Sequence, residues 1–360
     1  MNKKVEYFSS KDTNICKGIA ILFMVLHHLV GAFYNSFDLN WYEINAVDYP
    51  KILLLFSSSG KVCVSLFTIL SGYGMYKKYD SYIKETKKES YVPYIASRIA
   101  KFYTTYIPIF LTVFIYKCFT KFTSINSIIS YYNNRSIALL SIIYLLIDLF
   151  GLYKIFGTNS IINDWFVTAI IIFYILFPLI NKLTKKYKLF SILLLSFPWV
   201  ISMCFGGIKN DTFYYYLSEY SLGIYLSMNG LLDKFKNKVN IKNKIVTTML
   251  LLVSWILRLI FALPFDIILA LAIILFEIQH LSNLNFNNVL SFLGKNSSNI
   301  WLLHSYCIGI ISKIAYDIYN RYILTILLSL TISFLIEAIK KRIKIDNFVG
   351  KIKRVLLNNI

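Results

Sequence analysis

Residues 16–34 read CKGIAILFMVLHHLVGAFY, an apolar run whose one lysine, Lys17, lies near its start. A helix of this length can cross the hydrocarbon core of a bilayer, which takes roughly 20 apolar residues. The preceding residues, MNKKVEYFSSKDTNI, are too polar to begin a cleavable signal peptide, and the run ends without a small-residue cleavage pattern. We therefore expect this segment to remain in the chain as its first transmembrane helix.

The whole chain is too apolar for a soluble protein. Of its 360 residues, 57% are hydrophobic and 16% are charged, whereas an ordinary soluble domain carries about 25% charged residues. A fold in water cannot hide that much apolar side chain. The composition predicts an all-α protein, a polytopic transmembrane helix bundle, with residues 1–360 forming a single integral membrane domain.

Eleven apolar stretches have about the length of a membrane span. Lysine and arginine on short loops favour the cytoplasm. The basic segments between the stretches can all lie in the cytoplasm only if one stretch does not cross the membrane. We take this stretch to be Ser136–Phe156, which contains Asp148 and Gly151 and would lie along the membrane or re-enter it. We expect about ten spans plus this re-entrant helix, a bacterial plasma membrane location and cytoplasmic basic tails at 1–15 and 340–360. The eleven stretches are Cys16–Tyr34, Ile52–Tyr76, Ile99–Phe119, Ser136–Phe156, Trp165–Ile180, Leu189–Phe205, Phe213–Met228, Ile245–Phe261, Pro264–His280, Ser298–Tyr316 and Ile323–Ile339.

The formal net charge of +20 comes from 38 Lys plus Arg against 18 Asp plus Glu. Because the basic residues lie between the apolar runs, positive-inside topology explains them first, with binding of an anionic cofactor as the alternative. We expect membrane lipid and no nucleic acid as a partner. The five cysteines are scattered without paired or metal-like spacing, so we expect neither a disulfide framework nor a metal site.

Ionisable residues inside the spans are candidate functional groups, because burying them in lipid is costly. His28 lies about 16 Å along the helix axis from Lys17, and its neighbour His27 points about 100° away, so at most one of the two histidines faces a given cavity. A histidine there can take a proton from a hydroxyl; the alternative is a neutral side chain bonded to a neighbouring helix. For His304, in SSNIWLLHSYC, we favour that structural alternative.

A second set of candidates is basic. Arg98 and Lys101 open the third apolar stretch three residues apart, so they share one helical face and can grip phosphates. Lys17 lies at the start of the first helix. Taken alone, these three side chains are better explained as determinants of topology.

Five motifs, read in order, resemble the acyltransferase-3 family of membrane acyltransferases. They span about residues 10–310 and read NICKGIAILFMVLHH, VSLFTILSGYGM, SRIAKFYTTYIP, NDWFVTAIIIFYILFPLI and LGKNSSNIWLLH. Each motif alone is weak, because apolar helices match one another easily, whereas five in order are fairly specific.

The resemblance implies a transferase of the O-acetyltransferase type. Such an enzyme moves an acyl group, usually acetyl, from cytoplasmic acetyl-CoA or another acyl-CoA to a hydroxyl of a cell-surface polysaccharide or lipid-linked sugar of the cell envelope. Acyl-CoA is then a donor substrate, and no cofactor is bound permanently. The resemblance places catalysis on His28 rather than His27. It places coenzyme A binding on Lys17, Arg98 and Lys101, and weaker substrate-binding roles on Ser71, Tyr73, Trp165 and His304.

Three positions depart from the family pattern. Asn14 stands where an aspartate often precedes the first-helix arginine, Lys17 replaces that arginine, and Ile170 stands where many members carry a glutamate. Because lysine is a point charge and not a planar fork, bidentate phosphate contact is lost at Lys17.

The alternative function is a transporter or exporter of a surface glycan or its precursor. Transporters also keep polar residues and wet cavities at mid-membrane depth. The enzyme is favoured by the coincidence of His28 with a cytoplasmic basic cluster, since a glycan exporter has no need to bind a thioester carrier.

Overall fold

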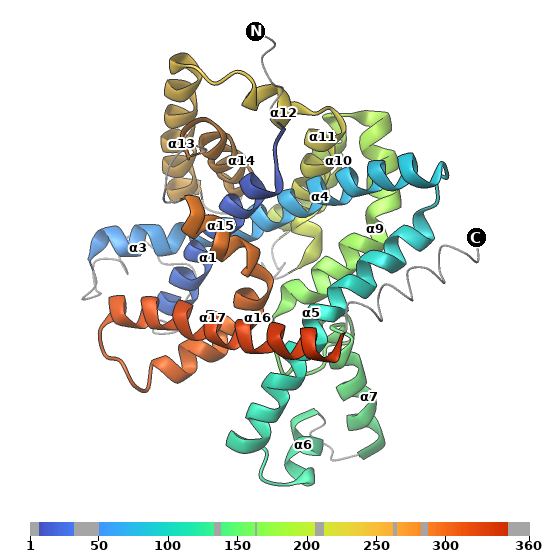
Figure 1. Ribbon diagram of the computed structural model, residues 1–360, viewed down its shortest axis with the longest axis vertical. Coiled ribbons are helices and arrows are strands. Elements are labelled where there is room, and N and C mark those ends of the chain that lie inside the picture. Colours follow the sequence, from blue (N-terminus) through green and yellow to red (C-terminus); the bar gives the residue numbers. More distant parts are fainter. Residues whose placement is uncertain are drawn as a thin grey trace. The chain divides into compact units, whose positions relative to one another are not determined.

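The computed structural model describes residues 7–31, 50–132, 138–162, 164–205, 212–261, 265–281 and 287–344. Every regular element in these ranges is a helix, which confirms the all-α prediction for this part of the chain (Figure 1). Most of the connection between the first two apolar stretches and much of the two predicted basic tails lie outside the described residues.

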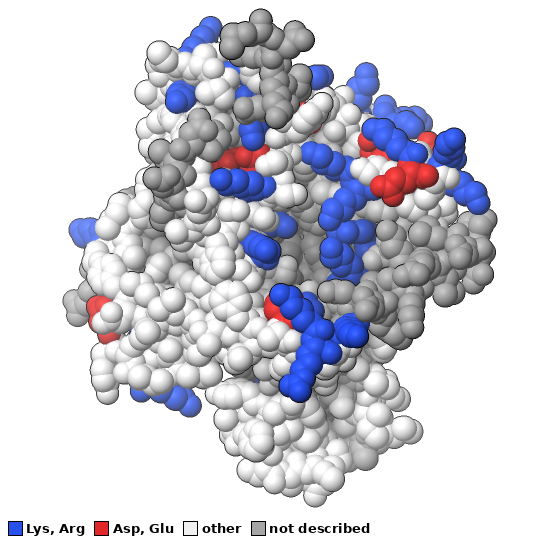
Figure 2. Space-filling model, in the orientation of Figure 1, with Lys and Arg blue, Asp and Glu red and all other residues white. Residues whose placement is uncertain are grey.

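Six helical segments of the described chain are long and apolar enough to cross a membrane. On the face seen in Figure 2, broad areas carry no charge, and Lys and Arg gather in patches. The chain is therefore a membrane-helix protein, and the total of about ten spans stays a prediction. The six segments are Ser10–Val30, Lys51–Thr86, Tyr91–Thr120, Trp165–Tyr187, Ile241–Phe261 and Ile318–Ile343.

The chain divides into two compact units. Unit 1 joins Met1–Lys78 to Glu219–Ser333, and unit 2 joins Tyr79–Ser218 to Phe334–Ile360. Each unit is thus assembled from segments that are far apart in the sequence. The expectation of a single domain stays a prediction.

The first helix of unit 1, α1 (Ser10–Gly31), begins earlier than the apolar run. Ser9 and Asp12 cap it reciprocally: a carboxylate oxygen of Asp12 accepts from the Ser9 amide at 2.6 Å, and the Ser9 hydroxyl accepts from the Asp12 amide at 3.3 Å. These bonds satisfy amides that the first turn leaves without helical partners. Lys17, which we expected at the helix start, therefore lies about two turns inside α1.

Helix α1 packs directly against α15 (Asn287–Lys295) in unit 1 (Figure 1). A Cβ added to Gly18 would lie 2.1 Å from the carbonyl oxygen of Leu290, and one added to Gly294 would lie 1.8 Å from that of Asn14. Small residues thus bring the two backbones into contact, as in many membrane helix pairs. A single residue, Asn296, then joins α15 to α16 (Ser297–Ile311).

Helix α13 (Ile241–Phe261), also in unit 1, buries polar side chains and exposes apolar ones, as a membrane helix does. Its buried side chains are the polar residues Thr247, Ser254 and Arg258. A surface helix in water shows the reverse pattern, whereas polar side chains of membrane helices face the protein interior. The large apolar side chains that α13 exposes are Ile241, Ile245, Val246, Met249, Leu252, Val253, Ile256, Ile260 and Phe261.

Unit 2 contains the long helix α5 (Tyr91–Thr120), which begins eight residues before the predicted start at Ile99. This start was not predicted because Pro93 would break a helix in its interior. A proline is tolerated in the first turn, where the backbone amide has no helical partner. Arg98 and Lys101 therefore lie about two and three turns inside α5.

The stretch 136–156 contains α7 (Ala138–Leu149) and α8 (Tyr153–Phe156). At 1.5 Å per residue, α7 is about 18 Å long, which is less than the hydrocarbon core of roughly 30 Å. Carbonyls where α7 ends accept hydrogen bonds from other helices: the Tyr106 hydroxyl donates to Asp148 at 2.8 Å, and the Thr168 hydroxyl donates to Gly151 at 2.6 Å. Helix α7 alone is too short to cross, and the re-entrant path stays a prediction.

The remaining elements complete the two units. In chain order they are α3 (Lys51–Ser58), η1 (Ser59–Lys61), α4 (Val62–Thr86), α6 (Ile125–Tyr132), α9 (Trp165–Tyr187), α10 (Phe190–Phe205), η2 (Phe213–Tyr216), α11 (Leu217–Met228), α12 (Leu231–Lys236), α14 (Asp266–Phe276), the π-helical turn η4 (Glu277–Leu281) and α17 (Ile318–Ile343).

Candidate functional site

The two adjacent histidines of α1 have different neighbours. His27 is buried, and its Nδ1 lies 2.9 Å from the carbonyl oxygen of Ser57 at the end of α3. Because a carbonyl oxygen only accepts, Nδ1 is the donor. His28 is half-buried, and its ring centroid lies 4.7 Å from that of His304 in α16. His27 therefore joins α1 to α3, whereas His28 lies beside a second imidazole.

His304 is held in one orientation by its own helix. It is 2% exposed, its Nδ1 donates to the carbonyl oxygen of Trp301, and its Nε2 lies 3.2 Å from the Ser305 hydroxyl. With the hydrogen on Nδ1, the neutral ring keeps an accepting nitrogen at Nε2. Two imidazoles from α1 and α16 are thus close together inside the helices of unit 1, in an arrangement able to accept and pass a proton.

A buried ion pair supports the break between α3 and α4. Arg258 Nε lies 2.5 Å from a carboxylate oxygen of Asp266, and the two residues are 8% and 1% exposed. Arg258 also donates to the carbonyl oxygen of Ser58 at 3.1 Å, and Trp255 Nε1 donates to the Ser59 hydroxyl at 2.8 Å. Interrupted helix backbone in lipid needs such partners within the protein. We did not identify this pair from the sequence, although opposite charges inside two apolar stretches were the signal.

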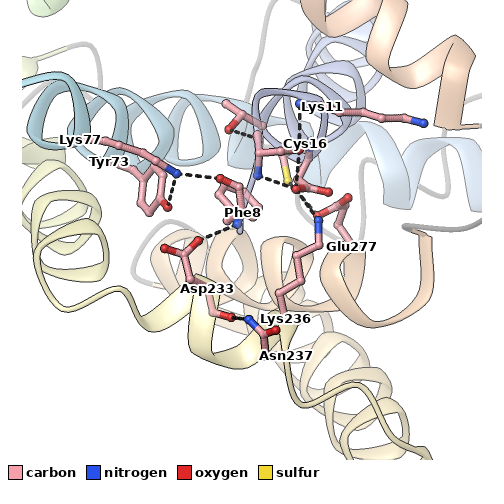
Figure 3. Close-up of polar contacts among 12 residues, drawn as sticks. Phe8, Lys11, Cys16, Tyr73, Lys77, Asp233, Lys236, Asn237 and Glu277 are labelled. Carbon is pink, nitrogen blue, oxygen red and sulfur yellow. Dashed lines mark hydrogen bonds and ion pairs between the residues drawn. The ribbon is translucent and has the colours of Figure 1, made fainter. Parts of the chain in front are cut away.

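Polar side chains also gather around the N-terminal half of α1 (Figure 3). Lys236 Nζ lies 2.7 Å from a carboxylate oxygen of Asp12, and the Cys16 thiol donates to Glu277 at 4.0 Å. Glu277 is fully buried where α14 passes into the π-helical turn. Lys17, the next residue after Cys16, is half-buried. The sequence interpretation did not include Glu277, although a carboxyl group near a predicted helix end was its signal.

Ser71, Gly72 and Tyr73 lie next to one another in α4, and Gly72 and Tyr73 have clear packing roles. A Cβ on Gly72 would lie 2.2 Å from the carbonyl oxygen of Tyr220, so this glycine permits a close crossing of α4 and α11. The Tyr73 ring packs edge-on against Phe8 at 5.3 Å, and Lys77 Nζ donates to the Phe8 carbonyl at 2.8 Å (Figure 3). Ser71 is half-buried. Substrate roles for Ser71 and Tyr73 stay predictions.

The other predicted residues lie in unit 2. Arg98 is half-buried and hydrogen-bonds Tyr174 of α9, and Lys101 is exposed on α5. Trp165 is the first residue of α9 and packs against Tyr216 with ring centroids 5.5 Å apart. The predicted donor cluster is therefore divided, with Lys17 in unit 1 and Arg98 and Lys101 in unit 2, and its joint action stays a prediction.

Comparison with known proteins identifies one family. The profile of the acyltransferase-3 family, described as an acyltransferase domain, matches residues 11–339. No curated protein and no solved structure matches the chain. The matched residues include His28, His304 and most of both units.

Proposed function

The chain belongs to the acyltransferase-3 family and is a membrane acyltransferase, and from this premise we propose that it carries out O-acylation of a cell-envelope glycan. The donor is cytoplasmic acyl-CoA, most simply acetyl-CoA, and the acceptor is a hydroxyl of a polysaccharide or lipid-linked sugar. The single observation that supports this most strongly is the pairing of His28 with His304, because acyl transfer to a hydroxyl needs a positioned base.

In the proposed reaction His28 is the general base. It takes the proton of the acceptor hydroxyl as that oxygen attacks the thioester carbonyl, the carbon–sulfur bond breaks, and the thiolate of coenzyme A takes up a proton. Such a base typically contributes about 10² to 10⁴ in rate. His304, held through Nδ1 by the Trp301 carbonyl, positions the His28 ring from 4.7 Å away.

Basic side chains serve the donor in this proposal. Lys17, Arg98 and Lys101 bind the phosphates of coenzyme A from the cytoplasmic side, and Arg98 can offer a planar fork to two phosphate oxygens. Lys17 offers a point charge. The half-buried positions of Lys17 and Arg98 support this role, since a phosphate reaching them gains charge partners within the protein.

Sealed vesicles that contain the protein and receive labelled acetyl-CoA on the cytoplasmic side test the proposal. Label is expected on envelope glycan, and His28→Gln is expected to lower the rate by about 10² or more. His280→Gln is the matched control, because His280 stacks on Phe276 in a different part of unit 1. Full acylation by His28→Gln would overturn the role of His28, and glycan export without any acylation would favour a transporter.

A further inference from the structure

A polar cavity lies in unit 2, at the end of α5 remote from Arg98 and Lys101. Its volume is about 290 Å³, at the small end of ligand pockets, which run from roughly 300 to 1,000 Å³. A space of this size suits a single sugar ring. Its walls are formed by Tyr131, Tyr153, Lys154, Thr158, Asn159 and Ser160, together with Gly157.

The cavity wall is built from hydrogen-bonded side chains. The Tyr131 hydroxyl donates to the carbonyl oxygen of Ser160 at 2.5 Å, and the Asn159 amide donates to the carbonyl oxygen of Tyr131 at 2.5 Å. These two bonds hold α6 against the segment that follows α8. The Thr158 hydroxyl oxygen is buried and has no hydrogen-bond partner among the described residues. The wall therefore offers a ligand an aromatic ring, an amide and a hydroxyl, which are the groups that bind sugars.

Lysines surround the same tyrosine. Lys117 Nζ and Lys121 Nζ lie 4.8 Å and 4.9 Å from the Tyr131 ring centroid, and Lys117 also donates to its hydroxyl at 3.2 Å. Burial raises the pKa of Tyr131 to about 12, so the phenol is neutral at physiological pH and contributes no negative charge. Lys154 adds a third cation at the cavity wall.

The carboxylates of the described residues 117–164 already have hydrogen-bond donors. Asp148 is buried, and one of its oxygens accepts from the Tyr132 hydroxyl and from the Ile161 amide, both at 2.7 Å. Asp164 caps α9 by accepting from the Phe166 amide at 3.1 Å. Lys121 and Lys154 are exposed beside the cavity, so their positive charge can meet an anionic ligand there.

The positive-inside rule does not explain the positive charge around the cavity. Lys117 lies about 28 Å along α5 from Arg98, close to the roughly 30 Å thickness of the hydrocarbon core. If Arg98 and Lys101 bind coenzyme A in the cytoplasm, the cavity opens toward the outer face. The positive-inside rule predicts few lysines there, so Lys117, Lys121 and Lys154 need another role.

We propose that this cavity binds one acidic sugar residue of the acceptor glycan, with the Tyr131 ring and Asn159 contacting the sugar and the lysines contacting its carboxylate or phosphate. The inference rests on the proposed function, because it assigns the acceptor to the face opposite the donor. It adds the chemical class of that acceptor: an anionic glycan.

Binding in the absence of donor tests the inference separately from catalysis. The full chain in phosphatidylcholine nanodiscs is titrated calorimetrically with trigalacturonate, an acidic trisaccharide, and with its methyl ester, which has the same rings without the charge. The acid is expected to bind at least about tenfold more tightly than the ester. Equal affinities would overturn the proposal.

Charge variants locate the site. The exposed pair Lys121→Gln and Lys154→Gln is expected to weaken trigalacturonate binding about tenfold, and Asn159→Ala is expected to weaken binding of the acid and of the ester alike. Lys185→Gln with Lys186→Gln is the matched control, since both lysines are exposed on α9 away from the cavity. Equal losses in the control pair and the cavity pair would contradict the assignment.

Other anions are separate arms of the test. Inorganic phosphate and nanodiscs containing phosphatidylglycerol are compared with trigalacturonate. The proposal would be overturned if trigalacturonate no longer bound in nanodiscs that contain phosphatidylglycerol and if the lysine substitutions weakened lipid binding instead. That result would assign the lysines to lipid headgroups. If the vesicle assay shows no acyl transfer but the acid binds here, the proposed function fails while the anionic site stands.

Discussion

Two groups of cations, one in each unit, have different partners. In unit 1, Arg258 pairs with Asp266, and Lys236 pairs with Asp12. At the far end of α5 in unit 2, Lys117 and Lys121 instead lie over the face of Tyr131. A carboxylate compensates the charge of a cation, whereas an aromatic ring contacts the cation without carrying a compensating net charge.

This difference gives each unit a distinct expected response to mutation. Removing one partner of a buried ion pair leaves an uncompensated charge in a medium of low dielectric constant, so the cost falls on folding. A lysine over an aromatic ring contributes about 0.5–1 kcal/mol at an exposed site, so its loss should fall mainly on binding. Stability and affinity measurements can therefore separate the two regions.

The largest effect is expected from Arg258→Met. The substitution leaves the buried Asp266 carboxylate without its cation and removes the donor to the Ser58 carbonyl. We therefore expect a loss of about 3–5 kcal/mol of unfolding free energy. The melting temperature of the purified protein in detergent measures this loss. Adding Asp266→Leu should recover a large part of it, because the pair is then replaced by apolar side chains. An unchanged melting temperature in Arg258→Met would show that the pair is not structural.

Gly294→Leu is expected to disrupt the contact between α1 and α15. Its Cβ would lie 1.8 Å from the carbonyl oxygen of Asn14, and backbone atoms cannot move aside as a side chain can. We expect destabilisation of at least about 1–3 kcal/mol, the usual cost of overpacking, read from thermal unfolding. Gly309→Leu is the control, because a Cβ there meets nothing within 4 Å. Similar losses at both glycines would contradict close backbone packing.

His27→Ala sharpens the distinction between the adjacent histidines. It removes the imidazole donor to the buried Ser57 carbonyl and the packing of the buried ring, so we expect about 1–3 kcal/mol of destabilisation. His28→Ala should retain more of the melting temperature and lose more of the acyl-transfer rate per folded molecule. The reverse ranking, with His27 governing the rate and His28 the stability, would exchange the roles assigned to them.

The smallest stability effect is expected in unit 2. Tyr131→Phe keeps the ring under Lys117 and Lys121 but removes the hydroxyl that donates to Ser160, so we expect a loss of about 0.5–1.5 kcal/mol of stability. Trigalacturonate affinity should fall only slightly, since the ring remains. Tyr131→Ala should lower that affinity strongly by calorimetry. A large affinity loss in Tyr131→Phe would show that the hydroxyl, and not the ring, contacts the ligand.

The sequence predicted those features that depend on local pattern. Apolar runs predicted helices, and the family motifs predicted the acyltransferase family. Helix starts were less predictable, because Ser9 and Asp12 cap α1 before its apolar run, and Pro93 lies within the first turn of α5.

Long-range contacts were beyond reach of the sequence. Nothing in the residues around His304 shows that its ring lies 4.7 Å from that of His28, because that contact depends on how α1, α15 and α16 pack. The pairing of Arg258 with Asp266 likewise depends on the antiparallel return of α14 along α13. The cavity at Tyr131 needed two separate segments, α6 and residues 153–160, to be placed in space.

The connection between α15 and α16 is one residue long, Asn296, and this limits which insertions the enzyme can tolerate. Inserting a single residue between Gly294 and His304 would rotate His304 by about 100° and shift it by about 1.5 Å along α16. Its ring would then face away from His28, with no loop to absorb the change. We expect functional natural variants to keep the length of this segment invariant while tolerating insertions in connections elsewhere, so its length is a diagnostic for active homologues in genome surveys.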